Sequence, residues 1–243
     1  MCQRKSMMYD RLATYYDALV KDEEATQAWV QWMEQRITSP AAILELACGS
    51  GEITLQLAND GFEMTALDLS QSMVQQAKQK PGAEKIQFYC QNMLELDNLG
   101  SYDAIGCFCD SFNYLIMEEE VEQLFQQVHN HLKPEGLFFF DTHSLDRLQE
   151  FEEEYNETGA FEDCEYQWSI MSEEDRIYQD FAFYLPDGTI HQEHHLQRVY
   201  TPEYLEQELQ KYFEIESVKT DFDQEGICEG EKYFYICRKK ESK

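Results

Sequence analysis

The sequence predicts a doubly wound α/β sheet into which a small antiparallel sheet is inserted. Short apolar runs alternate with helical stretches from residue 41 to residue 142, with short turns between them. From about residue 161 to residue 200, aromatic or aliphatic residues instead alternate with polar ones. Regular β-α alternation is typical of a parallel sheet with helices on both faces, and period-two alternation indicates half-buried antiparallel strands.

The order of elements follows from these patterns. The opening segment, Tyr9 to Arg36, has apolar residues at helical spacing and predicts two helices with a break near Lys21–Ala25. Turns are expected at 81–82 and 133–136, where proline and glycine occur. The core is predicted to contain five strands, at 41–48, 62–69, 86–90, 102–109 and 137–142, and three helices, at 53–59, 71–79 and 118–132.

Three strands are predicted for the insertion, at 161–171, 176–185 and 190–200. Pro186-Asp187-Gly188 forms a hairpin turn between the last two. A helix over 203–212 and strands over 215–221 and 233–238 then resume the α/β pattern. We therefore expect residues 1–145 to form N-terminal helices plus a nucleotide-binding core, 146–200 an inserted lid, and 201–243 the completion of the core.

The balance of charge excludes several classes of partner. Lysine and arginine total 19 against 48 aspartates and glutamates among 243 residues, which gives a formal net charge of −29. Such a surface repels phosphate backbones and anionic lipids, so we expect neither a nucleic-acid nor a membrane partner. The apolar runs fall short of the ~20 residues that span a bilayer, and the first ten residues are polar. A cytoplasmic location is therefore expected.

The cysteines and histidines predict no metal site. The eight cysteines form no Cys-x-x-Cys pair, and most lie in apolar runs, as reduced structural thiols do. His191, His194 and His195 occur together, but in a strand His194 points away from the other two. No acidic pair at a familiar spacing completes a site, so we interpret these histidines as polar residues of the inserted sheet.

Two features at the ends of the first two predicted strands indicate a nucleoside site. Gly49 and Gly51 follow the first strand, where a backbone without a Cβ can approach a ligand. Asp68 ends the second strand, about 20 residues further on, where a carboxylate can accept from ribose hydroxyls. Thr54 takes the third glycine position of the dinucleotide fingerprint, which disfavours a pyrophosphate. Glu45, within the first strand, suits a cationic ligand.

Five segments resemble motifs of the class I S-adenosylmethionine-dependent methyltransferases. They are Glu45–Gly51, Asp68–Met73, Asn92–Met93, Asp110–Leu115 and Leu132–Gly136. The likeness is strongest to small-molecule enzymes: bacterial members of unassigned substrate and sugar-amine N-methyltransferases. It covers about residues 9–142 and, more loosely, the closing strands. It implies a Rossmann-like sheet of seven strands with the last antiparallel, S-adenosyl-L-methionine as cofactor and S-adenosyl-L-homocysteine as product.

The resemblance also implies roles for single residues at the cofactor. Glu45 would accept from the methionine amino group, and Asp68 would hold the ribose. Asn92 departs from the aspartate of many relatives, but its side-chain oxygen can still accept from the adenine amino group. The remaining implied contacts are the backbone of Ala47, Gly49, Ser50 and Gly51 along the cofactor, Leu69 and Met73 beside adenine, and the Met93 amide at the adenine edge.

Residues after the fourth and fifth strands are candidates for the chemistry. Methyl transfer is an in-line displacement, so alignment supplies most of the acceleration, and a base is needed only for a protonated or hydroxyl acceptor. Asp110 and Asn113 are expected to face the donor and orient the acceptor, with Asp110 capping a helix as the alternative. His143 is either a base near neutral pH or a surface histidine bonded to Asp141 or Asp146.

Tyr9 and Tyr16 lie in the opening helices, and relatives close such a segment over the cofactor. The resemblance therefore implies that both contact cofactor or acceptor and that Tyr16 is a catalytic candidate; core packing is the alternative. Together, these features predict methyl transfer to an amine or hydroxyl of a small-molecule acceptor. An RNA or protein methyltransferase is the second hypothesis, followed by a nicotinamide-dependent oxidoreductase and a non-catalytic binding module. The aromatic-rich insertion is predicted to select the acceptor and is a candidate homodimer contact.

Overall fold

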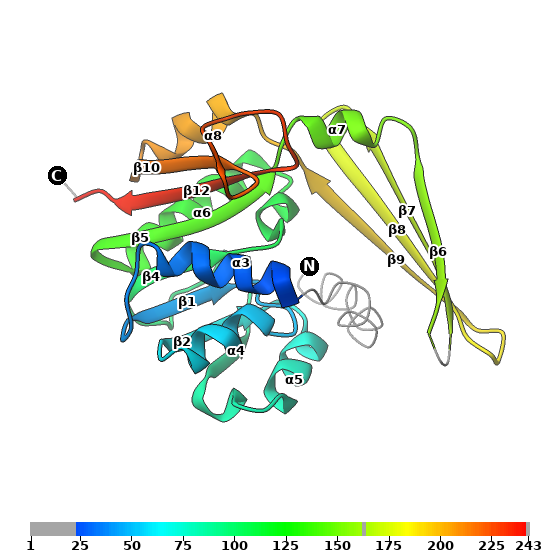
Figure 1. Ribbon diagram of the computed structural model, residues 1–243, viewed down its shortest axis with the longest axis horizontal. Helices are drawn as coiled ribbons and strands as arrows, with labels where there is room; N and C mark the ends of the chain where they lie inside the picture. The colour runs from blue at the N-terminus through cyan, green and yellow to red at the C-terminus, as the bar shows by residue number, and fades with distance from the viewer. Residues whose placement is uncertain (1–22, 162–163, 242–243) are drawn as a thin grey trace.

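The computed structural model describes residues 23–161 and 164–241. These residues form an α/β core around a central sheet and a second, antiparallel sheet that extends away from the core (Figure 1). The doubly wound fold with an inserted antiparallel sheet, predicted from the sequence, is confirmed. None of the helices in the described ranges is long and apolar enough to cross a bilayer.

The central sheet has eight strands in the order β11-β10-β12-β5-β4-β1-β2-β3. Strands β3, β2, β1, β4 and β5 pair in parallel, whereas β12 pairs antiparallel with β5 and β10. Seven strands with the last antiparallel were expected, and the eighth, β11, is a two-residue edge strand. The bounds are β1 (Ala42–Leu46), β2 (Glu63–Asp68), β3 (Gln87–Cys90), β4 (Tyr102–Cys107), β5 (Leu132–His143), β10 (Phe213–Thr220), β11 (Gln224–Glu225) and β12 (Lys232–Lys239).

Helices cover both faces of this sheet (Figure 1). One face packs against α3 (Glu23–Glu34), α4 (Glu52–Asn59) and α5 (Gln71–Gln79), and the other against α6 (Glu118–His131) and α8 (Pro202–Leu209). Along β5, Phe139 points to the first face, while Phe138 and Phe140 point to the second. All three rings are fully buried, and each stabilises the fold by about 1.5–3 kcal/mol relative to exposure.

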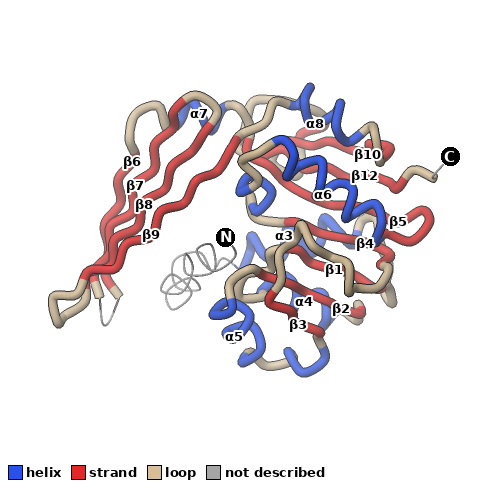
Figure 2. Tube along the Cα trace, turned by 180° about the vertical axis from the view of Figure 1, so that it is seen from behind, coloured by secondary structure: helices blue, strands red, loops and turns tan. Residues whose placement is uncertain are grey.

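The second sheet contains four antiparallel strands in sequence order, seen beside the core in Figure 2. They are β6 (Tyr155–Ala160), β7 (Glu165–Glu173), β8 (Arg176–Tyr184) and β9 (Ile190–Arg198), and the short helix α7 (Asp146–Glu150) leads into them from β5. The sequence predicted the last three strands and missed β6. This edge strand reads Tyr-Asn-Glu-Thr-Gly-Ala and is largely exposed, so it lacks the apolar alternation of a half-buried strand.

Two further expectations are corrected by the structure. Residues 133–136 do not form a turn before the fifth strand but lie within β5, where Glu135 adopts a φ of 61°. The first helix of the opening pair lies outside the described residues. Residues 23–25, within the predicted break, are helical in α3.

Candidate functional site

The order of the central sheet reverses between β1 and β4, and a cavity of about 500 Å³ opens at the carboxyl ends of these strands. Ligands of doubly wound sheets bind at such a reversal. Residues that follow β1 to β4 line one side of the cavity, and residues of β7, β8 and β9 line the other. Both sheets therefore bound the cavity, whose volume lies within the range of about 300–1,000 Å³ that small-molecule sites occupy.

Asp68 and the glycine turn form one end of the cavity. The Asp68 Oδ2 accepts the Gly49 N–H at 2.8 Å, and its Oδ1 accepts the Ser70 N–H at 2.8 Å. Burial raises the pKa of Asp68, while these two backbone donors act to lower it. Because each carboxylate oxygen has a second lone pair, Asp68 can also accept both hydroxyls of a ribose.

Gly51 keeps the turn after β1 close to α5. Its φ is 80°, which favours glycine, and a Cβ here would lie 3.2 Å from the Cβ of Ala77. The same glycine precedes α4 and accepts the Leu55 N–H through its carbonyl at 2.9 Å. The turn is therefore held in one position beside the cavity.

An apolar wall lies next to Asp68. Leu69 and Met73 follow β2, and Met93 and Leu94 follow β3; all four line the cavity. Asn92 lies at the same wall, and its Oδ1 accepts the Leu94 N–H at 3.1 Å. Apolar side chains with a ribose acceptor beside them fit an adenosine, so these residues suit the cofactor implied by the sequence resemblance.

Three of the predicted cofactor residues, Glu45, Ser50 and Gly51, are not among the residues that line the cavity. Glu45 is 3% exposed on β1 and accepts a hydrogen bond from the Thr54 hydroxyl. Burial raises its pKa to about 8, partly offset by the Thr54 hydrogen bond. In contrast, Ala47 and Gly49 do line the cavity. Glu45 therefore lies away from the cavity lining, and its burial favours the protonated carboxyl.

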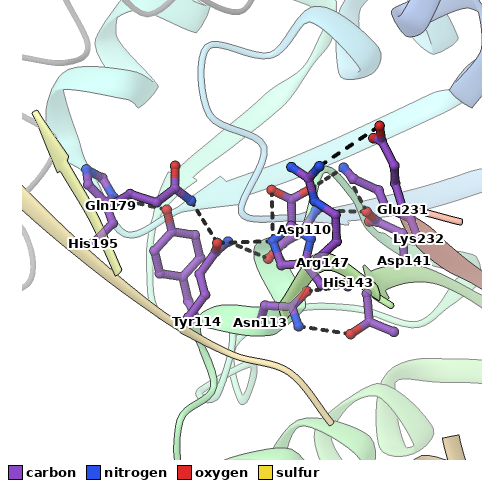
Figure 3. A network of polar contacts seen from close by, with 12 residues as sticks. Asp110, Asn113, Tyr114, Asp141, His143, Arg147, Gln179, His195, Glu231 and Lys232 are labelled. Atoms are coloured by element: carbon purple, nitrogen blue, oxygen red, sulfur yellow. Dashed lines mark hydrogen bonds and ion pairs between the residues drawn. The ribbon is translucent and has the colours of Figure 1, made fainter. Parts of the chain in front are cut away.

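Asp110, Lys232 and Asp141 form an ion cluster at the other end of the cavity (Figure 3). The Lys232 ammonium bonds the Asp110 carboxylate and lies 3.4 Å from the Asp141 Oδ2, which also accepts the Asp110 N–H at 2.9 Å. Although burial acts to raise it, Lys232 and His143 hold the pKa of Asp110 well below its ordinary value. Burial and the neighbouring Asp110 charge raise the pKa of Asp141. Lys232 is therefore the counter-ion of two carboxylates.

His143, a predicted base, is buried behind this cluster and not among the cavity-lining residues. Its Nε2 lies 3.1 Å from the Gln197 Oε1 and 3.7 Å from the Asp110 Oδ2. Gln197 in turn donates to the Asp110 carbonyl at 3.3 Å, and its Oε1 accepts from Gln179 at 2.9 Å. Burial lowers the pKa of His143, which favours the neutral ring. The surface alternative foreseen for His143 is wrong, because the side chain is buried. Its role as a base stays a prediction.

Asn113 was expected to face the donor, and the structure corrects this. The residue is fully buried in the 3₁₀ helix η3 (Ser111–Tyr114). Its Nδ2 donates to the Thr142 hydroxyl at 2.9 Å and to the Arg198 carbonyl at 2.7 Å, and its Oδ1 accepts the His143 N–H at 3.0 Å. Asn113 therefore joins three segments: η3, the end of β5 and the end of β9.

Sequence reasoning missed several polar residues that the second sheet and the last strand bring to the cavity. Lys232 begins β12, and Gln179, Phe181 and His195 come from β8 and β9. Lys232 is the cation that directly precedes the apolar run 233–237 of β12, which was a usable signal. The aromatic-rich insertion, which contains Phe181, was predicted to select the acceptor. No local signal marked Gln179 or His195, because alternation indicates which face they share but not what that face contacts.

The remaining predictions for the site concern two tyrosines of the opening segment and metal binding. Tyr9 and Tyr16, the predicted contacts from the opening helices, lie outside the described residues. Within residues 23–161 and 164–241, no group of three or more His, Cys, Asp or Glu side chains is arranged to hold a metal ion.

Comparisons with known proteins identify the family. The family described as "Methyltransferase domain" matches residues 43–136. The chain is 34% identical over 245 residues to "Putative methyltransferase YqeM" of Bacillus subtilis, covering 97% of this chain and 99% of that protein. An S-adenosylmethionine-dependent methyltransferase from Clostridium acetobutylicum superposes with a TM-score of 0.80 at 26% identity, over 95% of this chain and 98% of that one.

A sugar N-methyltransferase, KedS8 of Streptoalloteichus, shares the fold with a TM-score of 0.73 at 19% identity, over 93% of this chain and 92% of that one. The full-length match to YqeM and the cavity that fits an adenosine both support a methyltransferase that binds S-adenosylmethionine. The chain therefore belongs to the class I S-adenosylmethionine-dependent methyltransferases, with S-adenosyl-L-methionine as its cofactor.

Proposed function

We propose that the protein transfers a methyl group to an amine or hydroxyl of a small molecule that binds between the core and the second sheet. One observation carries this proposal: a single cavity runs from the adenosine-fitting residues Asp68 and Leu69 to the polar residues Asp110 and Tyr114 and to the lid residue His195. A donor and an acceptor bound at its two ends would meet inside it. Holding both reactants in one geometry supplies much of the acceleration of a displacement reaction.

The residues at the cofactor end have binding roles in this proposal. Asp68 holds the ribose, the backbone of Ala47 and Gly49 lines the amino-acid part, and Leu69, Met73, Asn92 and Met93 surround the base. When the cofactor binds, its positively charged methionine amino group would take the place of the proton on the Glu45 carboxyl, and Glu45 would accept a hydrogen bond from it. When bound, the cofactor supplies an electrophilic methyl group on a positively charged sulfur.

Asp110 is the proposed catalytic residue at the acceptor end, with Tyr16 as a further contact from the opening segment. The Lys232 ammonium keeps Asp110 ionised, so its carboxylate can orient a donor group on the acceptor. His143 positions Asp110 indirectly: it bonds Gln197 and lies beside the Asp110 carboxylate. The lid, residues 146–200, supplies Trp168 and Phe181 as aromatic walls and sets the acceptor's shape.

A small molecule fits this site better than RNA. The net charge of −29 opposes a polyanion, and the likeness to the sugar N-methyltransferase KedS8 supports a compact acceptor. Residues of both sheets line the acceptor end, so an acceptor would bind between them.

Binding and transfer can be tested separately. We expect calorimetry to detect S-adenosyl-L-methionine and S-adenosyl-L-homocysteine but not nicotinamide dinucleotides. Methyl-labelled cofactor incubated with amines, alcohols, phenols and nucleosides should label at least one amine or alcohol. Binding without label on any acceptor would favour a cofactor-binding module, whereas label only on RNA or protein would overturn the small-molecule assignment.

A further inference from the structure

Tyr114 and His195 face one another across the boundary between the core and the second sheet (Figure 3). Tyr114 ends η3, which follows β4, and His195 lies on β9; both residues line the cavity. The Tyr114 hydroxyl lies 3.0 Å from the His195 Nδ1, and the two ring planes cross at 66°. A phenol is therefore within hydrogen-bonding distance of an imidazole at the acceptor end.

Glu193 lies on the far side of this imidazole. Its Oε2 is 3.6 Å from the His195 Nε2, and the two side chains are only 5% and 2% exposed. They share one face of β9 because they are two residues apart in a strand. A carboxylate beside Nε2 favours the tautomer with its proton there, which leaves Nδ1 to accept the Tyr114 proton.

Among the described residues, few neighbours of His195 other than Tyr114 and Glu193 can carry a proton. From β8, Phe181 packs edge-on at 5.3 Å between ring centroids, and the uncharged Gln179 pairs opposite His195. His194 also contributes to the cavity lining, but its side chain is largely exposed and bonds Asp180 at 2.5 Å. On the core side of the cavity lie Cys109 and the Asp110–Lys232 pair.

Charge at this end favours a cationic ligand. Three carboxylates, Asp110, Asp141 and Glu193, lie near this end, and the neighbouring cations are Lys232 and Arg147. In a partly desolvated cavity, such an excess of negative charge attracts an ammonium ion. An ammonium has no lone pair and must lose a proton before it can accept a methyl group.

We propose that Tyr114 and His195, positioned by Glu193, form a proton relay that deprotonates an ammonium acceptor. The ammonium gives a proton to the Tyr114 oxygen as the phenol proton moves to the His195 Nδ1, and Glu193 stabilises the resulting imidazolium. The freed nitrogen lone pair forms the bond to the methyl carbon, and the methyl–sulfur bond breaks with its electron pair left on sulfur. The relay proton leaves to solvent with the product. This inference rests on the proposed methyl transfer and specifies its acceptor and base.

The first test follows label from the methyl donor into matched amine and alcohol pairs, such as glucosamine with glucose and phenethylamine with phenethyl alcohol. We expect label on amines of the panel and not on their alcohols. Label on the alcohols alone, or on no amine while S-adenosyl-L-homocysteine binds in calorimetry, would overturn the relay's assigned acceptor. Failure of the wild-type protein to bind S-adenosyl-L-homocysteine would instead overturn the proposed function.

The second test uses pH to separate proton transfer from structural support. In Tyr114→Phe and His195→Asn, kcat/KM for the labelled amine should fall about 100-fold at pH 7, and activity should recover near pH 10, where the amine loses its proton to water. Glu193→Gln should lose about 10-fold. Equal losses at pH 7 and pH 10, or no loss in either relay variant, would overturn the relay. Tyr184→Phe, an exposed tyrosine of the same sheet, is the matched control and should behave as wild type.

The third test needs no acceptor. Nitrogen chemical shifts of the His195 ring in the S-adenosyl-L-homocysteine complex should show the proton on Nε2, and Tyr114→Phe should shift the Nδ1 resonance. A proton on Nδ1 in the neutral ring would overturn the relay, because the imidazole would then donate to the phenol.

Discussion

The two ends of the cavity are held together over very different distances along the chain. At the cofactor end, Asp68 accepts from Gly49, 19 residues away, and from Ser70, two residues away. At the acceptor end, Lys232 bonds Asp110 across 122 residues, Gln197 bonds it across 87, and His195 meets Tyr114 across 81. The first end is built by backbone donors of adjacent βα turns, the second by side chains from elements that meet only in the folded chain.

This difference indicates how each end responds to change. Backbone donors cannot be removed by substitution, so the cofactor end is sensitive mainly to its few buried carboxyl groups. Side-chain partners can be removed singly, and each removal leaves another buried polar group without its partner. Single substitutions should therefore change the acceptor end more readily than the cofactor end, whose backbone geometry they leave in place.

The largest expected effect concerns Glu45 at the cofactor end. Its folded pKa of about 8 exceeds the ordinary value of 4.5, so the folded protein alone holds this proton between these values. Stability therefore falls as pH rises through this window, by up to about 5 kcal/mol. Glu45→Gln keeps an acceptor for the Thr54 hydroxyl and carries no charge.

Urea unfolding of wild type and Glu45→Gln from pH 5 to pH 9 tests this expectation. The variant should lose less stability with rising pH and exceed wild type above pH 7. Calorimetry should nevertheless show weaker binding of S-adenosyl-L-methionine, because the amino group loses its carboxylate. Parallel stability curves would show that Glu45 is ionised in the free protein.

Lys232→Met should give the next largest loss, about 3 kcal/mol in the free energy of unfolding at pH 7. Removing one partner of a buried ion cluster leaves Asp110 and Asp141 as adjacent uncompensated charges. The loss should shrink toward pH 5, because these carboxyls then take up protons, and Asp110→Asn in the same chain should recover part of it. Lys219→Met, which removes a surface ion pair with Glu225, is the control and should cost less than about 1 kcal/mol. A loss equal to the control would mean that solvent, not Lys232, balances the cluster.

The same difference in chain separation explains what the sequence could predict. The helix expected at 71–79 matches α5, because Ser70 caps its start and Pro81-Gly82 follows its end. The glycine turn and Asp68 were found because both occur at the ends of adjacent strands, at a spacing that the fold prescribes. Such signals are local in the sequence, and most elements of the core carry them.

The acceptor end lacked local signals. His143 and Asn113 were identified as polar residues after strands, but only the packing of β9 against η3 and β5 shows that both are buried. Alternation along 190–200 placed His195 in a strand without indicating Tyr114 as its partner. Pairing between remote elements depends on how the second sheet sits on the core, which no periodicity encodes.

Asp68→Asn is expected to weaken binding of S-adenosyl-L-homocysteine about 30-fold, or about 2 kcal/mol. An amide offers one acceptor oxygen, and its NH₂ group would face the N–H of Gly49 or Ser70. Isothermal titration calorimetry measures the change. Asp187→Asn in the exposed β8–β9 turn should leave the affinity unchanged. An affinity within threefold of wild type for Asp68→Asn would show that the sugar is held by other groups.

The smallest effect, about 1 kcal/mol, is expected for Tyr200→Phe at the joint between the second sheet and the core. The buried Tyr200 hydroxyl donates to the Leu115 carbonyl at 2.6 Å, and phenylalanine leaves that acceptor unsatisfied. The ring itself should stay in place, because it stacks on Tyr204 and lies under Arg198. Unfolding in urea measures the loss, with Tyr89→Phe, whose exposed hydroxyl bonds only a surface glutamine among the described residues, as a control near zero. Affinity for S-adenosyl-L-homocysteine should not change, since Tyr200 is not among the residues that line the cavity. A fall in that affinity would show that the two ends of the cavity are coupled through the joint and would break the contrast between them.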